Sequence, residues 1–200
     1  MGEIHSPALV KLFVGLLTAF PELVTQVEER LTASFGPVDL RSRSFPFDDT
    51  HYYDDQMGHP LERYFFGFSE LVRPEALAGL KVKTNQIEAV MATADTRASR
   101  PVNLDPGYLE QAKVVLASTK NFYHRILLSD GIYAEVTLHF EGGSWHSFPW
   151  TFPDFRSGRY DGFFTSLRNA YRSQLKGISP RDAEAPGSSG SLDVFGLDEY

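Results

Sequence analysis

Asn103 and Asp105 stand two residues apart in the heptapeptide NLDPGYL, which ends at Leu109. A residue before proline favours extended backbone, so Asp105 is expected to be extended. Alternate side chains of an extended segment point the same way, which would present an amide and a carboxylate together. Pro106 and Gly107 suit the centre of a type II turn, which would then fix the direction of the pair.

This pair of side chains has two interpretations. Facing a cavity, it could recognise a ligand, and Asp105 could act as a general base. Asn and Asp near turns also bond to neighbouring backbone groups, which would make the pair structural. The heptapeptide is compatible with both.

Further acids and bases follow on the strands predicted downstream. Glu135 lies on the polar side of the strand expected over 132–140, and Lys113 and Arg125 lie on neighbouring segments. Antiparallel pairing could bring them together with Asp105 on one sheet surface. Two acids and two bases suit a phosphate or carboxylate ligand, with Asp105 or Glu135 as the catalytic candidate. They suit cross-strand ion pairs on a solvated face equally well.

Thr84 falls in the middle of the apolar stripe of a helix that Pro74 is expected to open. A buried threonine usually bonds to the carbonyl group four residues earlier. The alternative is that Thr84 and Asn85 line the mouth of a pocket and belong to the ligand site.

The acidic loop DDTHYYDD, residues 48–55, holds four carboxylates and one imidazole. Oxygen-rich groups of this kind suit Mg²⁺ or Mn²⁺, with Asp48, His51 and Asp55 as the candidate ligands. The spacing is not that of an EF-hand loop, and acidic loops are also often only solvated. The sequence also lacks HExxH and GxSxG, so the common zinc-hydrolase and serine-hydrolase motifs are missing.

Composition excludes several classes of function. The formal net charge of −7 argues against nucleic-acid binding through bulk electrostatics. The chain has no cysteine, which rules out disulfides, Cys-ligated zinc and thiol catalysis. The N-terminal apolar run is short and contains Lys11, so it is expected to form a buried strand. We therefore expect no membrane association and a cytoplasmic location.

The length of 200 residues fits one domain, expected over 1–177. Residues 178–200, rich in Pro, Gly, Ser and acids, are expected to form a disordered tail. Hydrophobic periodicity predicts strands over 10–18, 38–45, 61–71, 113–118, 123–128, 132–140 and 145–150, with helices after Pro21, after Pro74 and over 159–175. The first six elements follow the β-α-β-β-α-β order of a ferredoxin-like core. The expected class is α+β, a mostly antiparallel sheet extended by a C-terminal hairpin, with helices mainly on one face.

Two aromatic segments keep a second class of function open. The segment PWTFPDFR, residues 149–156, could stack on a ring of a ligand or cover the end of the sheet. The strand segment YFFGF, residues 64–68, or the C-terminal tail could instead dock a protein partner. The chain would then be an interaction protein without enzymatic activity.

The ordered motifs KLFVGLLT, KTN, VNLDPGYL, GIYAEVTL and PWTFPD resemble an uncharacterised prokaryotic family known as domain of unknown function 4416. The resemblance covers roughly residues 8 to 176 and implies no chemistry. The chain also lacks the GxxxxGK[ST] phosphate loop. The residues themselves predict binding of a small anionic, phosphorylated or nucleotide-like ligand, and they leave open whether the protein is an enzyme.

Overall fold

The computed structural model describes residues 2–3, 5–50 and 53–177. Within this part of the chain the strands are β1 (Val10–Thr18), β2 (Val38–Arg41), β3 (Phe45–Phe47), β4 (Leu61–Val72), β5 (Val102–Leu109), β6 (Lys113–Ser118), β7 (Ile126–Leu127), β8 (Tyr133–Glu141) and β9 (Ser144–Ser147). The helices are α1 (Val24–Phe35), α2 (Asp54–Met57), α3 (Leu77–Ala94), α4 (Pro153–Arg156) and α5 (Asp161–Gly177), with short 3₁₀ turns at Pro21–Leu23 and Pro74–Ala76.

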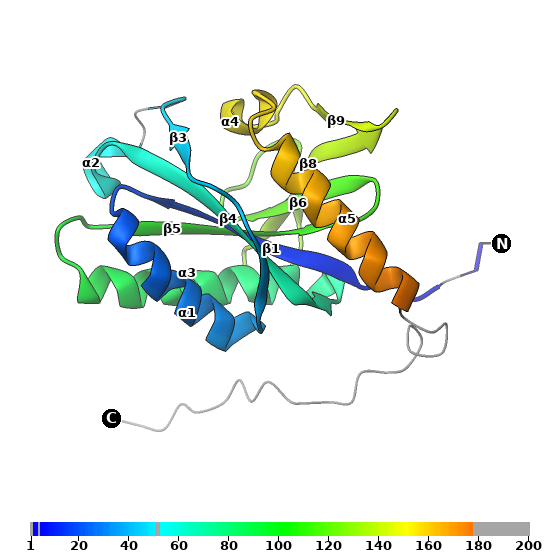
Figure 1. The fold of residues 1–200 in the computed structure, drawn as a ribbon, viewed down its shortest axis with the longest axis horizontal. Coiled ribbons are helices and arrows are strands. Elements are labelled where there is room, and N and C mark those ends of the chain that lie inside the picture. Colours follow the sequence, from blue (N-terminus) through cyan, green and yellow to red (C-terminus); the bar gives the residue numbers. More distant parts are fainter. Residues whose placement is uncertain (1, 4, 51–52, 178–200) are drawn as a thin grey trace.

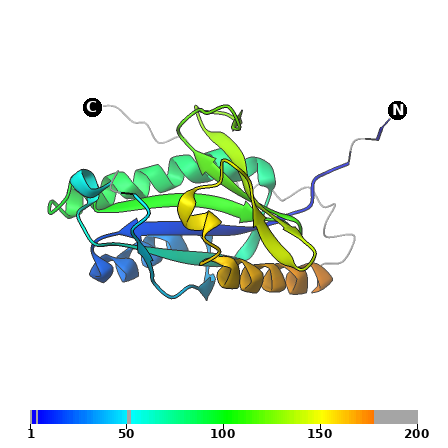
Figure 2. The same ribbon diagram turned by 90° about the horizontal axis from the view of Figure 1, so that it is seen from above.

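The strands form one sheet in the order β2-β4-β1-β5-β6-β8-β7, with β3 beside β4 and β9 beside β8. The pairings in the described residues are antiparallel. Seen from above the sheet, β5, β1 and β4 run side by side (Figure 2). The predicted mixed class with a mostly antiparallel sheet is therefore confirmed. The predicted tail, 178–200, lies outside the described residues.

Helices cover both faces of this sheet, and β1 is therefore buried along its whole length. On one face, Leu12 and Val14 of β1 pack with Leu31 of α1 and Met91 of α3. On the other face, Phe13 packs against α5. Figure 1 shows α1 and α3 below the strands and α5 crossing above them. We expected the helices mainly on one face of the sheet. This is correct for α1 and α3, but α5 lies on the other face.

The heptapeptide NLDPGYL contains no turn, contrary to the sequence-based expectation. It lies inside β5, where Pro106 is opposite Val14. A Cβ atom on Gly107 would lie 2.5 Å from the Val115 carbonyl oxygen and 2.6 Å from the Phe13 ring. The glycine therefore permits close packing in the sheet, and tertiary contacts override its local turn preference.

The heptapeptide also ends the pairing between β5 and β6. The register of these strands runs from Leu109↔Val114 to Gly107↔Leu116 and does not extend to Pro106. Proline has no N–H group to donate to a neighbouring strand. The sheet consequently opens between the first half of β5 and the end of β6.

Three predicted strands are shorter or interrupted, and one of them is the strand expected over 145–150, which ends at Ser147 of β9. The strand expected over 38–45 is divided into β2 and β3, and the hairpin strand expected over 123–128 is reduced to β7. None of the helices in the described part of the chain combines the length and the apolar character needed to cross a membrane.

Candidate functional site

A pocket of about 550 Å³ lies where β5 and β6 separate. Side chains from β3, β4, α3, β5, β6, β8 and α4 line it, together with residues of the loops beside these elements, among them the loop 119–125. Four of the residues predicted from the sequence are among them: Asn103, Asp105, Arg125 and Glu135. The separation of the two strands therefore creates the cavity into which these polar residues gather.

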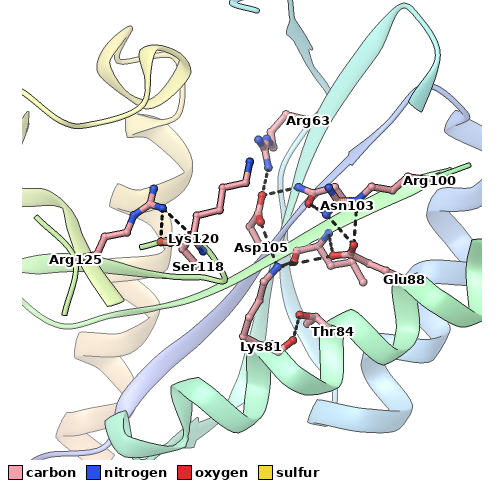
Figure 3. A network of polar contacts seen from close by, with 11 residues as sticks. Arg63, Lys81, Thr84, Glu88, Arg100, Asn103, Asp105, Ser118, Lys120 and Arg125 are labelled. Carbon is pink, nitrogen blue, oxygen red and sulfur yellow. Dashed lines mark hydrogen bonds and ion pairs between the residues drawn. The ribbon is translucent and has the colours of Figure 1, made fainter. Parts of the chain in front are cut away.

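Asp105 is surrounded by donors. Its carboxylate accepts a hydrogen bond from Asn103 Nδ2 at 2.7 Å, and Arg63 Nη1 and Lys81 Nζ lie 3.1 and 3.5 Å away (Figure 3). Burial acts to raise the pKa of Asp105, but Lys81 and Arg63 outweigh it and hold the pKa below its ordinary value. Asp105 is thus ionised at neutral pH and is a weak base.

Arg63 reaches Asp105 by crossing the central strand. It lies on β4 opposite Leu17, whereas Asp105 lies on β5 opposite Gly15. A Cβ atom on Gly15 would lie 3.4 Å from Arg63 Nη1 and 3.2 Å from the Phe65 ring. The missing side chain at position 15 therefore makes room for the guanidinium group over β1.

Lys81 enters the pocket from α3, on the opposite face of the sheet. Its Nζ donates to the Leu104 carbonyl at 2.6 Å and lies 3.8 Å from Glu88. Glu88 in turn accepts hydrogen bonds from the Leu104 N–H and from Arg100, which also donates to Asn103. This network fixes the backbone of β5 where β6 no longer pairs with it (Figure 3).

A second cluster surrounds Glu135, whose side chain is almost fully buried. Arg125 Nε donates to it at 2.7 Å, and His124 Nε2 lies 2.9 Å away. Arg125 also donates to Ser118 Oγ and to the Lys120 carbonyl oxygen. Glu135 is therefore held in a fixed position by Arg125 and His124, as a structural acid would be.

Three predicted residues lie elsewhere. Thr84 is fully buried in α3, and its hydroxyl donates to the Lys81 carbonyl at 2.9 Å. Asn85 is half-buried on α3 and Lys113 pairs with Glu110, and none of the three lines the pocket. The structural interpretation of Thr84 therefore agrees with its hydrogen bond, although the acceptor is three residues earlier and not four.

Asp154 is a pocket residue that sequence reasoning missed. It is 3% exposed, accepts a hydrogen bond from Tyr160 at 3.1 Å and lies 3.6 Å from Arg63 Nη2. Burial raises its pKa, although Arg63 and Tyr160 act to lower it. Arg63 thus lies between two carboxylates whose pKa values are shifted in opposite directions.

Arg63 and Asp154 each left a signal in the sequence. Arg63 is a charge inside a long apolar strand, and such charges are rarely buried without partners. Asp154 lies in the segment 149–156, for which the sequence analysis considered only the aromatic residues. Of those, Phe155 packs into the core, while Phe152 is 41% exposed and lines the pocket.

The pocket walls combine charge with aromatic rings. Five basic side chains line it against four acidic ones, although the whole chain carries a net charge of −7. Phe47, Tyr53 and Phe152 add apolar surface, and Lys120 lies exposed in the lining loop. The pocket is therefore locally more positive than the rest of the protein.

The predicted metal loop is only partly described. Asp48 is largely exposed and lies 3.5 Å from Arg159, and Asp55 is exposed on α2. His51 lies outside the described residues. Among the residues that the structure does describe, no group of three His, Cys, Asp or Glu side chains is placed to hold a metal ion.

The aromatic strand segment 64–68 is not an exposed docking patch. Phe65, Phe66 and Phe68 are at most 2% exposed, since they lie on the two faces of a strand covered on both sides. This burial overturns one form of the predicted interaction surface. The other form, the C-terminal tail, falls outside the described residues.

Comparisons with known proteins add a family and no chemistry. No curated protein and no solved structure matches the chain. The family model described as a domain of unknown function, DUF4416, matches residues 8–171, which include every pocket residue named above. The chain therefore belongs to the DUF4416 family.

Proposed function

We propose that the pocket binds a small anionic ligand, phosphorylated or nucleotide-like. The observation that carries the proposal is the excess of basic over acidic side chains in a pocket of a protein whose net charge is −7. Arginine and lysine bind phosphate and carboxylate groups through charge-assisted hydrogen bonds. Lys120 and Arg125 on the loop beside β6 are the residues that would contact the anionic group.

The aromatic residues support a ligand that also carries a ring. Phe47, Tyr53 and Phe152 line the same pocket, and aromatic rings stack on planar bases. The volume of about 550 Å³ lies within the range of about 300–1,000 Å³ that is usual for small-molecule sites. A nucleotide would place its base among these rings and its phosphate near Lys120.

Asp105 would recognise the ligand and not exchange a proton with it. Its lowered pKa makes it a poor general base at neutral pH, whereas a carboxylate accepts hydrogen bonds from hydroxyl or amino groups. Asp154, whose pKa burial raises, is the better candidate for proton transfer if the pocket is catalytic.

We also propose that the first half of the chain has a ferredoxin-like core. The order β2-β4-β1-β5 with antiparallel neighbours supports this assignment, because it reproduces a split βαβ arrangement. The two long helices of that core, α1 and α3, pack on one face.

The test is calorimetric titration of the full chain with nucleoside mono-, di- and triphosphates, sugar phosphates and inorganic phosphate. At least one phosphorylated compound should bind, and its unphosphorylated form should bind more weakly. Lys120→Ala should lower the affinity about tenfold, which corresponds to about 1.4 kcal/mol.

Lys113→Ala is the matched control, because Lys113 is a partly exposed lysine at the start of β6 that lies outside the pocket. It should leave the affinity unchanged. Equal losses in both variants would indicate nonspecific attraction, and the proposal fails if no compound of the panel binds to the wild-type protein.

A further inference from the structure

The strand at one edge of the sheet, β7, carries exposed apolar side chains. β7 lies at one end of the strand order, and it follows a loop that contains two exposed aromatic residues. The exposed set consists of Phe122, Tyr123, Ile126, Leu127 and Leu128, with exposed fractions from 42% to 77%. We call these five residues the β7 patch. Exposed apolar groups of this size on a sheet edge typically mark an association site.

The arrangement of the patch favours a partner strand over a partner that covers one face. Ile126 and Leu127 are consecutive in β7, so their side chains point to opposite faces of the sheet. Both are more than half exposed. A molecule that docks on one face would cover only one of them, whereas a strand added at the edge would cover both.

Backbone hydrogen bonds show which residue faces the open edge. Leu128 N–H donates to the Ile132 carbonyl oxygen at 2.8 Å, inside the β7–β8 hairpin. Backbone groups of an antiparallel pair alternate between the two sides of a strand. The N–H and C=O groups of Leu127 therefore point away from β8, toward the open edge.

We propose that β7 pairs with β7 of a second copy of this chain, antiparallel and about a two-fold axis near Leu127. The Leu127 N–H of each copy would donate to the Leu127 carbonyl oxygen of the other. An isologous contact of this kind buries the same patch on both copies, so the apolar side chains cover one another.

Charge supports a second copy as the occupant. Two molecules with a net charge of −7 repel each other, so their contact should avoid acidic residues. Residues 121–128 contain no acid, and the one arginine among them, Arg125, turns inward and pairs with Glu135. The patch is therefore a part of the surface where like-charge repulsion between copies is weak.

The area of the patch also fits a dimer. With about 200 Å² for a fully exposed residue of this size, the β7 patch offers about 600 Å² of surface per copy. Two copies would bury at most about 1,200 Å² together, just above the lower limit of about 1,000 Å² for a specific interface. We therefore expect a dimer of moderate affinity that dissociates on dilution. This proposal is independent of the pocket and its ligand.

Sedimentation velocity of the full chain over a range of concentrations tests the association. The wild-type protein should shift from monomer to dimer as its concentration rises. Leu127→Asp should raise the dissociation constant at least tenfold, because two carboxylates would meet at the axis. Val90→Asp is the matched control, since Val90 is an exposed apolar residue on α3 and lies outside the β7 patch. It should leave the dimer intact.

Cross-linking tests the position of the interface. The chain has no cysteine, so Leu127→Cys and Val90→Cys each introduce a single thiol. A short bis-maleimide should link the Leu127→Cys protein into dimers much faster than the Val90→Cys protein. A wild-type protein that stays monomeric, a dimer that survives Leu127→Asp, or equal cross-linking at both positions would each overturn the proposal.

Discussion

The two ends of the sheet face that carries α5 differ in chemistry. At one end, Phe65 stacks on Phe163 at 5.1 Å, and Phe13 and Phe164 meet edge to face at 5.2 Å. At the other end, Asp105 and its cationic partners line an open pocket. Gly15 lies at the boundary, between the Phe65 ring and the Arg63 guanidinium.

This difference assigns stability to the aromatic end of the sheet face and ligand binding to the polar end. Burying apolar rings stabilises the fold, whereas burying ion pairs often contributes little net stability, since desolvation opposes the attraction. The polar end holds Arg63, Lys81 and Asp154 at 6% exposure or less, next to a cavity. Such an arrangement is typical of a site that is kept for binding, and the following variants test the contrast.

Phe164→Ala should have the largest effect on stability. Phe164 is fully buried and contacts several rings of the aromatic end. Removing a buried phenylalanine side chain costs about 3–5 kcal/mol. Urea unfolding should show this loss, while ligand affinity of the folded protein is unchanged. A loss below about 1 kcal/mol would mean that the aromatic end is not the source of stability.

Asp105→Ala should have the next largest effect on stability. It leaves Arg63 and Lys81 buried with less compensating charge. Removing one partner of a fully buried pair costs about 3–5 kcal/mol, and we expect about 2–3 kcal/mol because the Asp105 side chain is 32% exposed. Unlike Phe164→Ala, this variant should also lose the ligand. Unchanged unfolding and binding would remove Asp105 from the site.

Asp105→Asn keeps the shape of the side chain and removes its charge, so it should alter the pH dependence of stability. The folded-state pKa of Asp105 lies below its ordinary value, so its contribution is present above that value and is lost as the pH falls through the folded pKa. Urea midpoints below about pH 4 should fall less steeply for the variant than for the wild type. Asp154 affects the pH dependence of stability in the opposite direction. Because its pKa is raised in the folded protein, its contribution to stability falls as the pH rises. Parallel pH profiles would show that Asp105 is not held by its cationic partners.

Thr84→Val should have the smallest effect. It removes one hydroxyl that bonds within α3, which costs about 1 kcal/mol. Because Thr84 does not line the pocket, ligand affinity should stay the same. A loss of affinity in calorimetry without a loss of stability would instead place Thr84 in the binding site.

Local pattern was sufficient for much of the fold. The apolar run 10–18 and the helical stripes after Pro21 and Pro74 predicted β1, α1 and α3, because hydrophobic periodicity reflects which faces are buried. The turn predicted at Pro106 and Gly107 was wrong, since packing against Phe13 and β6 outweighs the local preference of this dipeptide.

The sequence by itself predicted that Asn103, Asp105, Lys113, Arg125 and Glu135 could share one surface, because alternation along strands fixes which side chains point together. Lys113 does not line the pocket, and the other four do. Only the tertiary structure decided that they meet in a cavity with Arg63, Lys81 and Asp154. Those three come from β4, α3 and α4, distant in sequence, and no local period connects them. The pocket depends on where β6 parts from β5, and that separation is a property of strand pairing across the whole sheet.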